Sequence, residues 1–295
     1  MIKKILPVIS IITACVLWGL AIVLTKETLN KLIFPHIAMY RFLIASISFI
    51  PFLKKKTLPS INKKDMKYFT YTAFLTVPCT FLLQFAGISY TSSTNASLIV
   101  GMTPTIFIII SYILFRKKEK KTTILAVILS VIGILLVVGS PSSQNNWLGN
   151  TLIIISLITL ALSTIKSQKL MEIYSPLTTT ILTFWLGTIF LIPLVIYFYG
   201  LPSVEISKKL MISLCFQGVF CTSLAYFLWN YGLQKIPMAK AGIYANIEPI
   251  AGVFFSALLL SEEISLQIAI GGILVITAAI SISIIDFYNF KIIKK

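Results

Sequence analysis

The chain has 295 residues, of which 57% are hydrophobic and 12% are charged, and its mean hydropathy is +0.95. A soluble domain carries about a quarter charged residues, so this composition excludes an ordinary solvated surface. The formal net charge of +16 comes mostly from basic residues in short segments between apolar runs, which favours contact with lipid headgroups over binding of nucleic acid. We therefore predict an all-α polytopic membrane protein.

Ten apolar stretches near the length of a bilayer span follow one another along the chain. Backbone groups inside lipid must be satisfied within their own segment, so each stretch should be a helix. Some connections, such as 89–92 and 141–146, are so short that the neighbouring helices must be antiparallel. The expected spans are 5–25, 33–53, 68–88, 93–115, 122–140, 147–165, 177–199, 210–233, 238–259 and 265–286. The first apolar run is too long for a cleaved signal peptide and is expected to be a retained helix.

The basic residues predict the orientation of these spans. If the N-terminus is cytoplasmic, nineteen lysines and arginines fall in inner segments and only four lysines in outer loops. Cytoplasmic loops of membrane proteins carry such an excess. We expect a multi-pass protein of the cell inner (plasma) membrane with both termini in the cytoplasm.

An internal repeat organises the ten spans. The segment "AGISYTSSTNASLIVGMTPTI" (86–106) resembles "YGLQKIPMAKAGIYANIEPIA" (231–251), and at an offset of 145 Gly87 matches Gly232 and Pro104 matches Pro249. Each half has five spans, an odd number, so the second half must be inverted relative to the first. Inverted repeats around a central site are a recurrent design of secondary transporters. The predicted domains are 1–140 and 147–290, one five-helix repeat each, around a central cavity.

Several short motifs give the chain a resemblance to a known family. They are Trp18-Gly19 with Lys26, Arg41, Ser175-Pro176, Glu248-Pro249, and "LLLSEE", which contains Glu262. In this order and spacing they resemble the EamA-type families of the drug/metabolite transporter (DMT) superfamily, over about 5–286. The resemblance implies a ten-helix transporter whose cavity is lined by spans one, three, four, six, eight and nine. The chain departs from the pattern at "FRKKEKK", where the first repeat lacks the Gly-Glu turn, and near Leu160-Ala161, which lacks the tryptophan.

Glu248 is the acidic residue that lies well inside a predicted span. A carboxylate there costs about 2.5–3.5 kcal/mol on insertion scales, so it should face the protein interior or a wet cavity. Contact with a substrate amine, proton coupling, and a neutral carboxyl that bonds a neighbouring helix are all compatible with this position. Tyr244 shares its helix face, whereas Asn246 should point away unless the helix is distorted.

Two prolines lie at matching mid-membrane positions. Pro249 and Pro104 cannot donate backbone hydrogen bonds to the carbonyl groups of Ala245 and Val100. Each proline is therefore a candidate hinge for alternating access, and a static kink is the alternative.

Aromatic and polar side chains at similar depth are candidates for binding the solute. A small organic solute suits aromatic walls with a few polar groups, although interfacial anchoring and helix–helix hydrogen bonding explain such residues equally well. The candidates are Trp18, Phe81, Gln84, Asn95, Ser163, Tyr226, Trp229, Tyr244, Asn246 and Glu248, with Thr159 as an alternative to Ser163. Arg41 is expected to snorkel to the outer surface in a structural role, with contact to a substrate carboxylate as the alternative. His36 is expected to face solvent or lie at the interface. Lys240 is expected to anchor the inner end of a span, with contact to an anionic solute at the cytoplasmic mouth as the alternative.

These patterns predict a secondary transporter that moves a small organic solute by alternating access. The family resemblance implies an amino acid or a related metabolite or drug, with export as the usual direction. An importer of a vitamin or nucleoside-like metabolite, for example a flavin, is the alternative, and a membrane enzyme or a channel is a remoter one. No phosphate-binding loop of the GxxxxGK(S/T) type occurs, so we expect no direct use of ATP. The chain has one histidine, one acidic residue well inside a span and no metal-ligand spacing, so we expect no enzymatic activity, cofactor or metal. A monomer and a homodimer are both compatible with the sequence, as is proton coupling.

Overall fold

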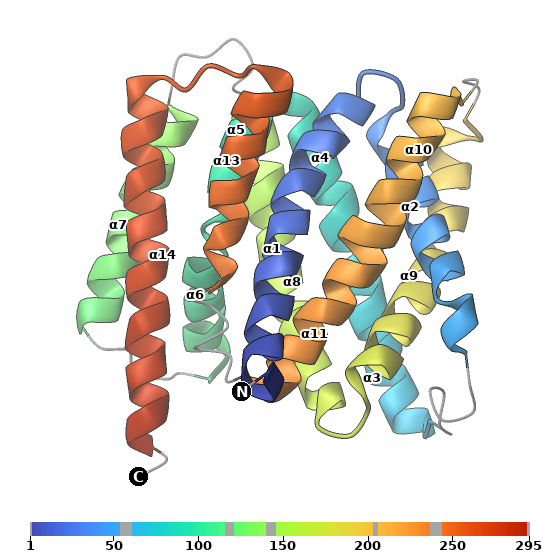
Figure 1. Cartoon of the computed structure of the whole chain (residues 1–295), viewed down its shortest axis with the longest axis horizontal. Helices are drawn as coiled ribbons and strands as arrows, with labels where there is room; N and C mark the ends of the chain where they lie inside the picture. Colours follow the sequence, from blue (N-terminus) through green and yellow to red (C-terminus); the bar gives the residue numbers. More distant parts are fainter. Residues whose placement is uncertain are drawn as a thin grey trace.

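The computed structural model describes residues 2–53, 61–115, 121–139, 146–202, 206–236 and 244–293, and this part of the chain is helical with short connections (Figure 1). Helix α1 begins the chain and runs from the lower to the upper end of the bundle as drawn in Figure 1. The helices up to residue 139 are α1 (Ile2–Thr28), α2 (Phe34–Ser48), α3 (Lys63–Phe74), α4 (Leu82–Tyr90), α5 (Ser93–Val100), α6 (Thr103–Phe115) and α7 (Lys121–Val138). A short 3-10 turn, Ile50–Phe52, follows α2.

The second half of the chain has a similar series of helices. They are α8 (Trp147–Met171), α9 (Pro176–Tyr199), α10 (Lys208–Phe216), α11 (Ala225–Lys235), α13 (Ile247–Leu260) and α14 (Leu266–Ile293). The last helix ends at the same lower end of the bundle at which α1 begins (Figure 1).

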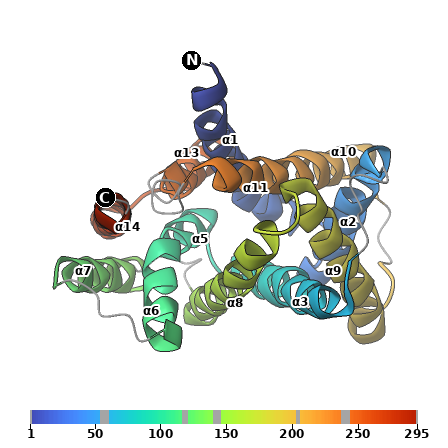
Figure 2. The same ribbon diagram turned by 90° about the horizontal axis from the view of Figure 1, so that it is seen from below.

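The helices form a bundle with one peripheral pair. Figure 2 shows α13, α1, α11 and α10 in one row, with α8, α3, α9 and α2 on the other side of it. Helices α7 and α14 pack mainly against each other at one edge. Gly133 and Gly271 permit this close approach, because a Cβ atom at either one would lie 2.8 or 2.7 Å from the other's carbonyl oxygen. Small residues are the usual means by which helices meet closely in lipid.

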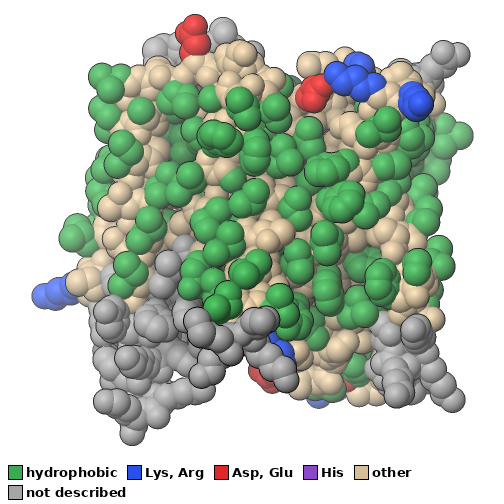
Figure 3. All heavy atoms as spheres, viewed as in Figure 1, with side chains coloured by type: hydrophobic (Ala, Val, Ile, Leu, Met, Phe, Trp, Pro, Cys, Tyr) green, Lys and Arg blue, Asp and Glu red, His purple; other side chains and the backbone are tan. Residues whose placement is uncertain are grey.

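The surface of the bundle matches a lipid environment. Apolar side chains cover the middle of the face shown in Figure 3, and the charged side chains visible there lie towards its upper and lower edges. Within the described residues, eight helices are long and apolar enough to cross a membrane, and Ile247–Leu260 and Leu266–Ser281 are shorter apolar helices. The protein is therefore a multi-pass membrane protein.

Two predicted spans are longer than expected and each contains a π-helical segment. Leu75–Phe81 joins α3 to α4, and Gln217–Leu224 joins α10 to α11. A wider turn leaves backbone carbonyls without their usual partner, and here hydroxyl groups five residues later donate to them: Thr80 to Leu75 (2.8 Å) and Thr222 to Gln217 (2.9 Å). Pro78, which has no N–H, contributes to the first distortion. Such segments are frequent at functional sites.

The fourth span is broken where the sequence suggests a kinked but continuous helix. Helix α5 ends at Val100, Gly101 and Met102 form a turn, and α6 begins at Thr103, so Pro104 lies in the first turn of a new helix. The Thr103 hydroxyl donates to the Val100 carbonyl at 2.6 Å. This bond replaces the one that the proline cannot make.

The ninth span is interrupted at the matching position. Tyr244 and Ala245 are helical, Asn246 forms a turn, and α13 begins at Ile247 with Pro249 in its first turn. Gly101 and Asn246 differ by the repeat offset of 145. Lys240, expected to anchor this span, lies outside the described residues.

Candidate functional site: a central cavity

A central cavity with about 1320 Å³ of empty space lies between helices from both halves of the chain. It extends from Thr25 and Ile88, near the upper end, to Leu233 and Met171, near the lower ends of their helices. Its polar lining residues are Thr25, Arg41, Thr76, Thr80, Gln84, Thr103, Ser163, Thr164, Ser167, Thr180, Thr183, Asn230, Asn246 and Glu248. Most of these groups are neutral, so the cavity suits a solute with both apolar and polar parts.

Tyr226 on α11 is the centre of an aromatic cluster at the cavity. Its ring lies 4.9 Å from that of Trp18 and 5.0 Å from that of Phe184, both in edge-to-face geometry, and 6.1 Å from that of Phe81. The Trp229 ring lies 5.4 Å from that of Trp18. Edge-to-face pairs hold one another in position, so this wall is ordered before any solute enters.

The structure brings most of the sequence-predicted binding residues together. Those that line the cavity are Trp18, Phe81, Gln84, Ser163, Tyr226, Trp229, Asn246 and Glu248, together with the candidate hinge residue Pro104. Asn95, Tyr244 and Pro249 are not among the lining residues. Thr159, the alternative to Ser163, hydrogen-bonds Thr80 at 2.8 Å and joins α8 to the π-helical segment.

Asn95 and Tyr244 contact other parts of the bundle. The Asn95 side chain is fully buried in the first turn of α5, and within the described residues its amide has no hydrogen-bond partner. Tyr244 packs against a separate cluster formed by Ile11, Cys15 and Ile236. The depth of Asn95 in its span, which made it a candidate, does not specify which way its side chain points.

Glu248 enters the cavity in the first turn of α13, beside a close contact with α1. A Cβ atom on Gly19 would lie 2.7 Å from the Glu248 carbonyl oxygen, so only glycine permits this approach. Asn246 also lines the cavity, because the turn at this residue breaks the regular helix that would have directed it away. Glu248 and Asn246 therefore share the site.

Arg41 does not snorkel to the surface. Its side chain is 2% exposed and lines the cavity, because this face of α2 packs against the π-helical segment Gln217–Leu224. Its Nε donates to the Thr222 hydroxyl at 2.6 Å, and its terminal nitrogens donate to the Thr25 hydroxyl at 3.3 Å and the Cys221 carbonyl at 3.4 Å. The guanidinium carbon also lies 5.2 Å from the centre of the Phe85 ring.

His36, expected at the interface, is also buried. It is 5% exposed, and its Nε2 lies 3.1 Å from the Gly200 carbonyl oxygen. The connection after α9 covers this end of α2, which the sequence of α2 alone does not indicate.

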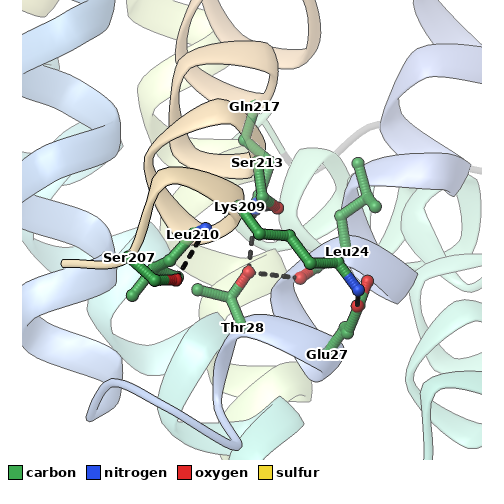
Figure 4. Close-up of polar contacts among 8 residues, drawn as sticks. All are labelled: Leu24, Glu27, Thr28, Ser207, Lys209, Leu210, Ser213 and Gln217. Carbon is green, nitrogen blue, oxygen red and sulfur yellow. Dashed lines mark hydrogen bonds and ion pairs between the residues drawn. The ribbon is translucent and has the colours of Figure 1, made fainter.

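A hydrogen-bond network behind Arg41 joins α1 to the second π-helical segment. Thr25 donates to the Gln217 side-chain oxygen at 3.1 Å, and the Gln217 amide donates to the hydroxyls of Thr28 (3.0 Å) and Ser213 (3.2 Å). Figure 4 shows the upper part of this network, where Lys209 also pairs with Glu27 at 3.5 Å on the exposed rim. Gln217 is fully buried, so the network is part of the core.

The sequence interpretation missed the contribution of the second and seventh spans to the lining. Helix α9 contributes Thr180, Thr183 and Phe184, and Asn230 of α11 donates to the Thr180 hydroxyl at 2.8 Å. Thr180 and Thr183 are three residues apart and share one face of an otherwise apolar helix, and this spacing is the signal that indicates a polar face.

Comparison with known proteins identifies the family. The chain is 28% identical over 280 residues to the "Uncharacterized transporter YetK" of Bacillus subtilis (strain 168), covering 87% of this chain and 84% of that protein. It is 26% identical over 265 residues to an "Uncharacterized transporter" of Archaeoglobus fulgidus, covering 88% of this chain and 91% of the relative. It is 23% identical over 277 residues to the "Biotin transporter" of Escherichia coli (strain K12), covering 92% and 90%.

The fold agrees with these similarities. A solved crystal structure superposes with a TM-score of 0.68 at 12% identity and covers 95% of this chain and 96% of its own, which supports the fold alone. The sequence model of the EamA-like transporter family matches twice, over residues 5–139 and 147–284. The chain belongs to the EamA-like transporter family.

Proposed function

We propose that the protein is a secondary carrier that moves a small organic solute across the inner (plasma) membrane by alternating access. The observation that carries this proposal is the central cavity, which draws its lining from both segments matched by the family model. A site between two halves allows their relative movement to expose it to one side and then to the other.

The proposed architecture is ten membrane spans in two five-helix repeats, 1–140 and 147–290, with the second inverted. Two pairs of irregularities support it: the π-helical segments Leu75–Phe81 and Gln217–Leu224, and the helix breaks at Gly101 and Asn246. The breaks place Pro104 and Pro249 at helix starts beside the cavity layer, where a change of angle costs few backbone hydrogen bonds. These two prolines are the proposed hinges.

The proposed substrate is an amino acid or a related metabolite or drug, with export as the favoured direction. Aromatic rings around Tyr226 provide an apolar wall, and Gln84, Ser163 and Asn246 provide neutral hydrogen-bonding groups. Glu248 is the proposed contact for a substrate amine or for a coupling proton. Import of a vitamin remains the second candidate, because one relative at 23% identity is a biotin transporter.

Counterflow in proteoliposomes tests the carrier function. Vesicles that contain the purified protein are loaded with an unlabelled candidate solute, and transient accumulation of the labelled solute is measured with a panel of amino acids, vitamins and nucleosides. Accumulation above protein-free vesicles supports a carrier and identifies its substrate. Simple equilibration that shows no counterflow or saturation indicates a channel and contradicts the proposal.

A further inference from the structure

Arg41 is a buried cation for which the carrier function stated so far gives no role. A charged side chain within a membrane span costs at least about 2.5 kcal/mol on insertion scales, so such groups usually have a partner. Within the described residues, the structure shows an ion pair between Lys209 and Glu27 at the exposed rim and none that involves Arg41. The hydrogen bonds of Arg41 all go to neutral oxygens.

These neutral oxygens hold the guanidinium without cancelling its charge. Thr222 and Thr25 accept from Arg41, and their own hydroxyl groups donate to the Gln217 backbone and side-chain oxygens, at 2.9 and 3.1 Å. Their hydroxyl groups are therefore oriented with lone pairs towards the cation. Gln217 is in turn fixed by Thr28, as the dashed lines in Figure 4 show. The side chain is thus positioned in advance.

The cavity side of Arg41 retains donor capacity. A guanidinium has five N–H donors, and the three hydrogen bonds above use three of them. The group also stacks on aromatic rings, with its central carbon 5.2 Å from the Phe85 centroid and 5.8 Å from that of Phe81. Stacking attracts the cation without neutralising it, so the cavity keeps a local positive charge near its upper end.

We propose that Arg41 binds a carboxylate of the transported solute. A guanidinium matches the two oxygens of a carboxylate, and such charge-assisted bonds strengthen in a dry site. A single cation balances a single negative charge, which favours a monocarboxylate over a phosphate dianion. Glu248 lines the same cavity and adds to the cost of any second negative charge.

The aromatic cluster indicates the length of the solute. Trp18 lines the cavity together with Arg41. Trp18 is seven residues before Thr25, the Arg41 partner, so the two lie on one face of α1 about 10 Å apart. A solute whose carboxylate is at Arg41 reaches Trp18 and Tyr226 with an apolar or aromatic body.

Ligand binding to the purified wild-type protein tests this inference, which rests on the proposed carrier function. Trp18 and Trp229 line the cavity, so tryptophan fluorescence reports occupancy. Each acid is compared with its own carboxamide: 3-phenylpropionate, hexanoate and L-phenylalanine. At least one acid should bind about tenfold or more tightly than its amide, the size of a charge-assisted hydrogen bond. Equal binding of acids and amides, or no binding of any acid, overturns the inference.

Arg41→Gln should lower acid binding much more than amide binding and so abolish this preference, and Arg41→Lys should retain part of it. Equal loss of acid and amide binding in Arg41→Gln would show a merely structural role. The matched control is Lys209→Gln, which removes a cation that is 82% exposed and outside the cavity lining. If Arg41→Gln does not fold, the comparison of acids with amides on the wild type still decides. If only neutral solutes show counterflow, the proposed carboxylate contact of Arg41 is wrong and the carrier function still stands.

Discussion

At the scale of single residues, the charged groups of the cavity carry the functional argument. Arg41 and Glu248 both line it. A cation held by neutral oxygens and a carboxyl group in the same cavity suit a solute that has groups of both signs, such as an amino acid. The two charges are thus expected to act on different parts of one solute.

Glu248→Gln is expected to remove the pH dependence of transport if Glu248 carries the coupling proton. The amide keeps the size of the side chain but cannot gain or lose a proton. Transport into proteoliposomes is measured with and without a pH gradient, and Glu263→Gln, at an exposed position, is the control. Unchanged transport at every pH in Glu248→Gln would exclude the coupling role.

At the scale of helices, charged side chains at the upper end of the bundle form hydrogen bonds with the backbone at helix ends. Glu262, just after α13, accepts from the backbone N–H groups of Ser93 at 2.9 Å and Thr94 at 2.8 Å, at the start of α5. Lys26 of α1 donates to the carbonyls of Ile88 and Thr91 at 3.2 and 2.6 Å, at the end of α4. Each charge is opposite in sign to the partial charge of the helix end that it contacts: the Glu262 carboxylate lies at a helix N-terminus, and the Lys26 ammonium lies at a helix C-terminus.

Glu262→Ala is expected to lower the melting temperature, with a loss of about 1–3 kcal/mol in stability, because two buried N–H groups lose a charged acceptor. The adjacent Glu263→Ala is a matched control, since Glu263 is exposed. Thermal unfolding of the detergent-purified variants provides the measurement. Equal melting temperatures for the two variants would contradict this role for Glu262.

Gly252→Val is expected to destabilise the contact between α13 and its neighbours. A Cβ atom at Gly252 would overlap the Ser97 side chain, and overpacking of this kind costs about 1–3 kcal/mol. Leu258→Val changes the opposite, 63% exposed part of α13 and is expected to have little effect. The two variants are compared by the yield of monodisperse protein and by its melting temperature. An unchanged yield and melting temperature for Gly252→Val would contradict the close contact at this glycine.

At the scale of the whole molecule, the two halves contribute complementary walls to one cavity. Helices α1, α2, α4, α5 and α6 line it from the first family match, and α8, α9, α11 and α13 from the second. Helices α7 and α14 lie at one edge and contribute no lining residue among the side chains that the structure describes. Movement of one wall against the other is therefore the expected transport step.

The proposed topology predicts the outcome of reporter fusions. Alkaline phosphatase fused after Leu201, in the connection that follows α9, should be active, because nineteen basic residues fall on the opposite, cytoplasmic side. A fusion after Glu172, between α8 and α9, should be inactive with this reporter and fluorescent with green fluorescent protein. The reverse pattern would invert the proposed orientation, and identical results at both sites would contradict the antiparallel arrangement of α9 with its neighbours.

The sequence by itself determined the membrane environment, the family and the approximate positions of the eight long apolar helices among the described residues. Apolar runs of span length allow little except helices in lipid, and the offset of 145 placed Pro104 and Pro249 at equivalent points. It also identified Trp18, Tyr226 and Glu248, because aromatic and charged groups are conspicuous in apolar helices. Their roles in binding remain proposals.

Only the tertiary structure decided which of these side chains meet. Arg41 was expected at the surface because its distance along α2 suggested snorkelling, but α1 and the π-helical segment around Thr222 enclose it. Asn95 was expected in the binding site from its depth in the fourth span and yet lies outside the cavity lining. The direction of a side chain depends on local helix phase, and π-helical turns and breaks such as that at Asn246 change that phase. These distortions are stabilised by hydroxyl–carbonyl bonds between residues that periodicity alone does not pair.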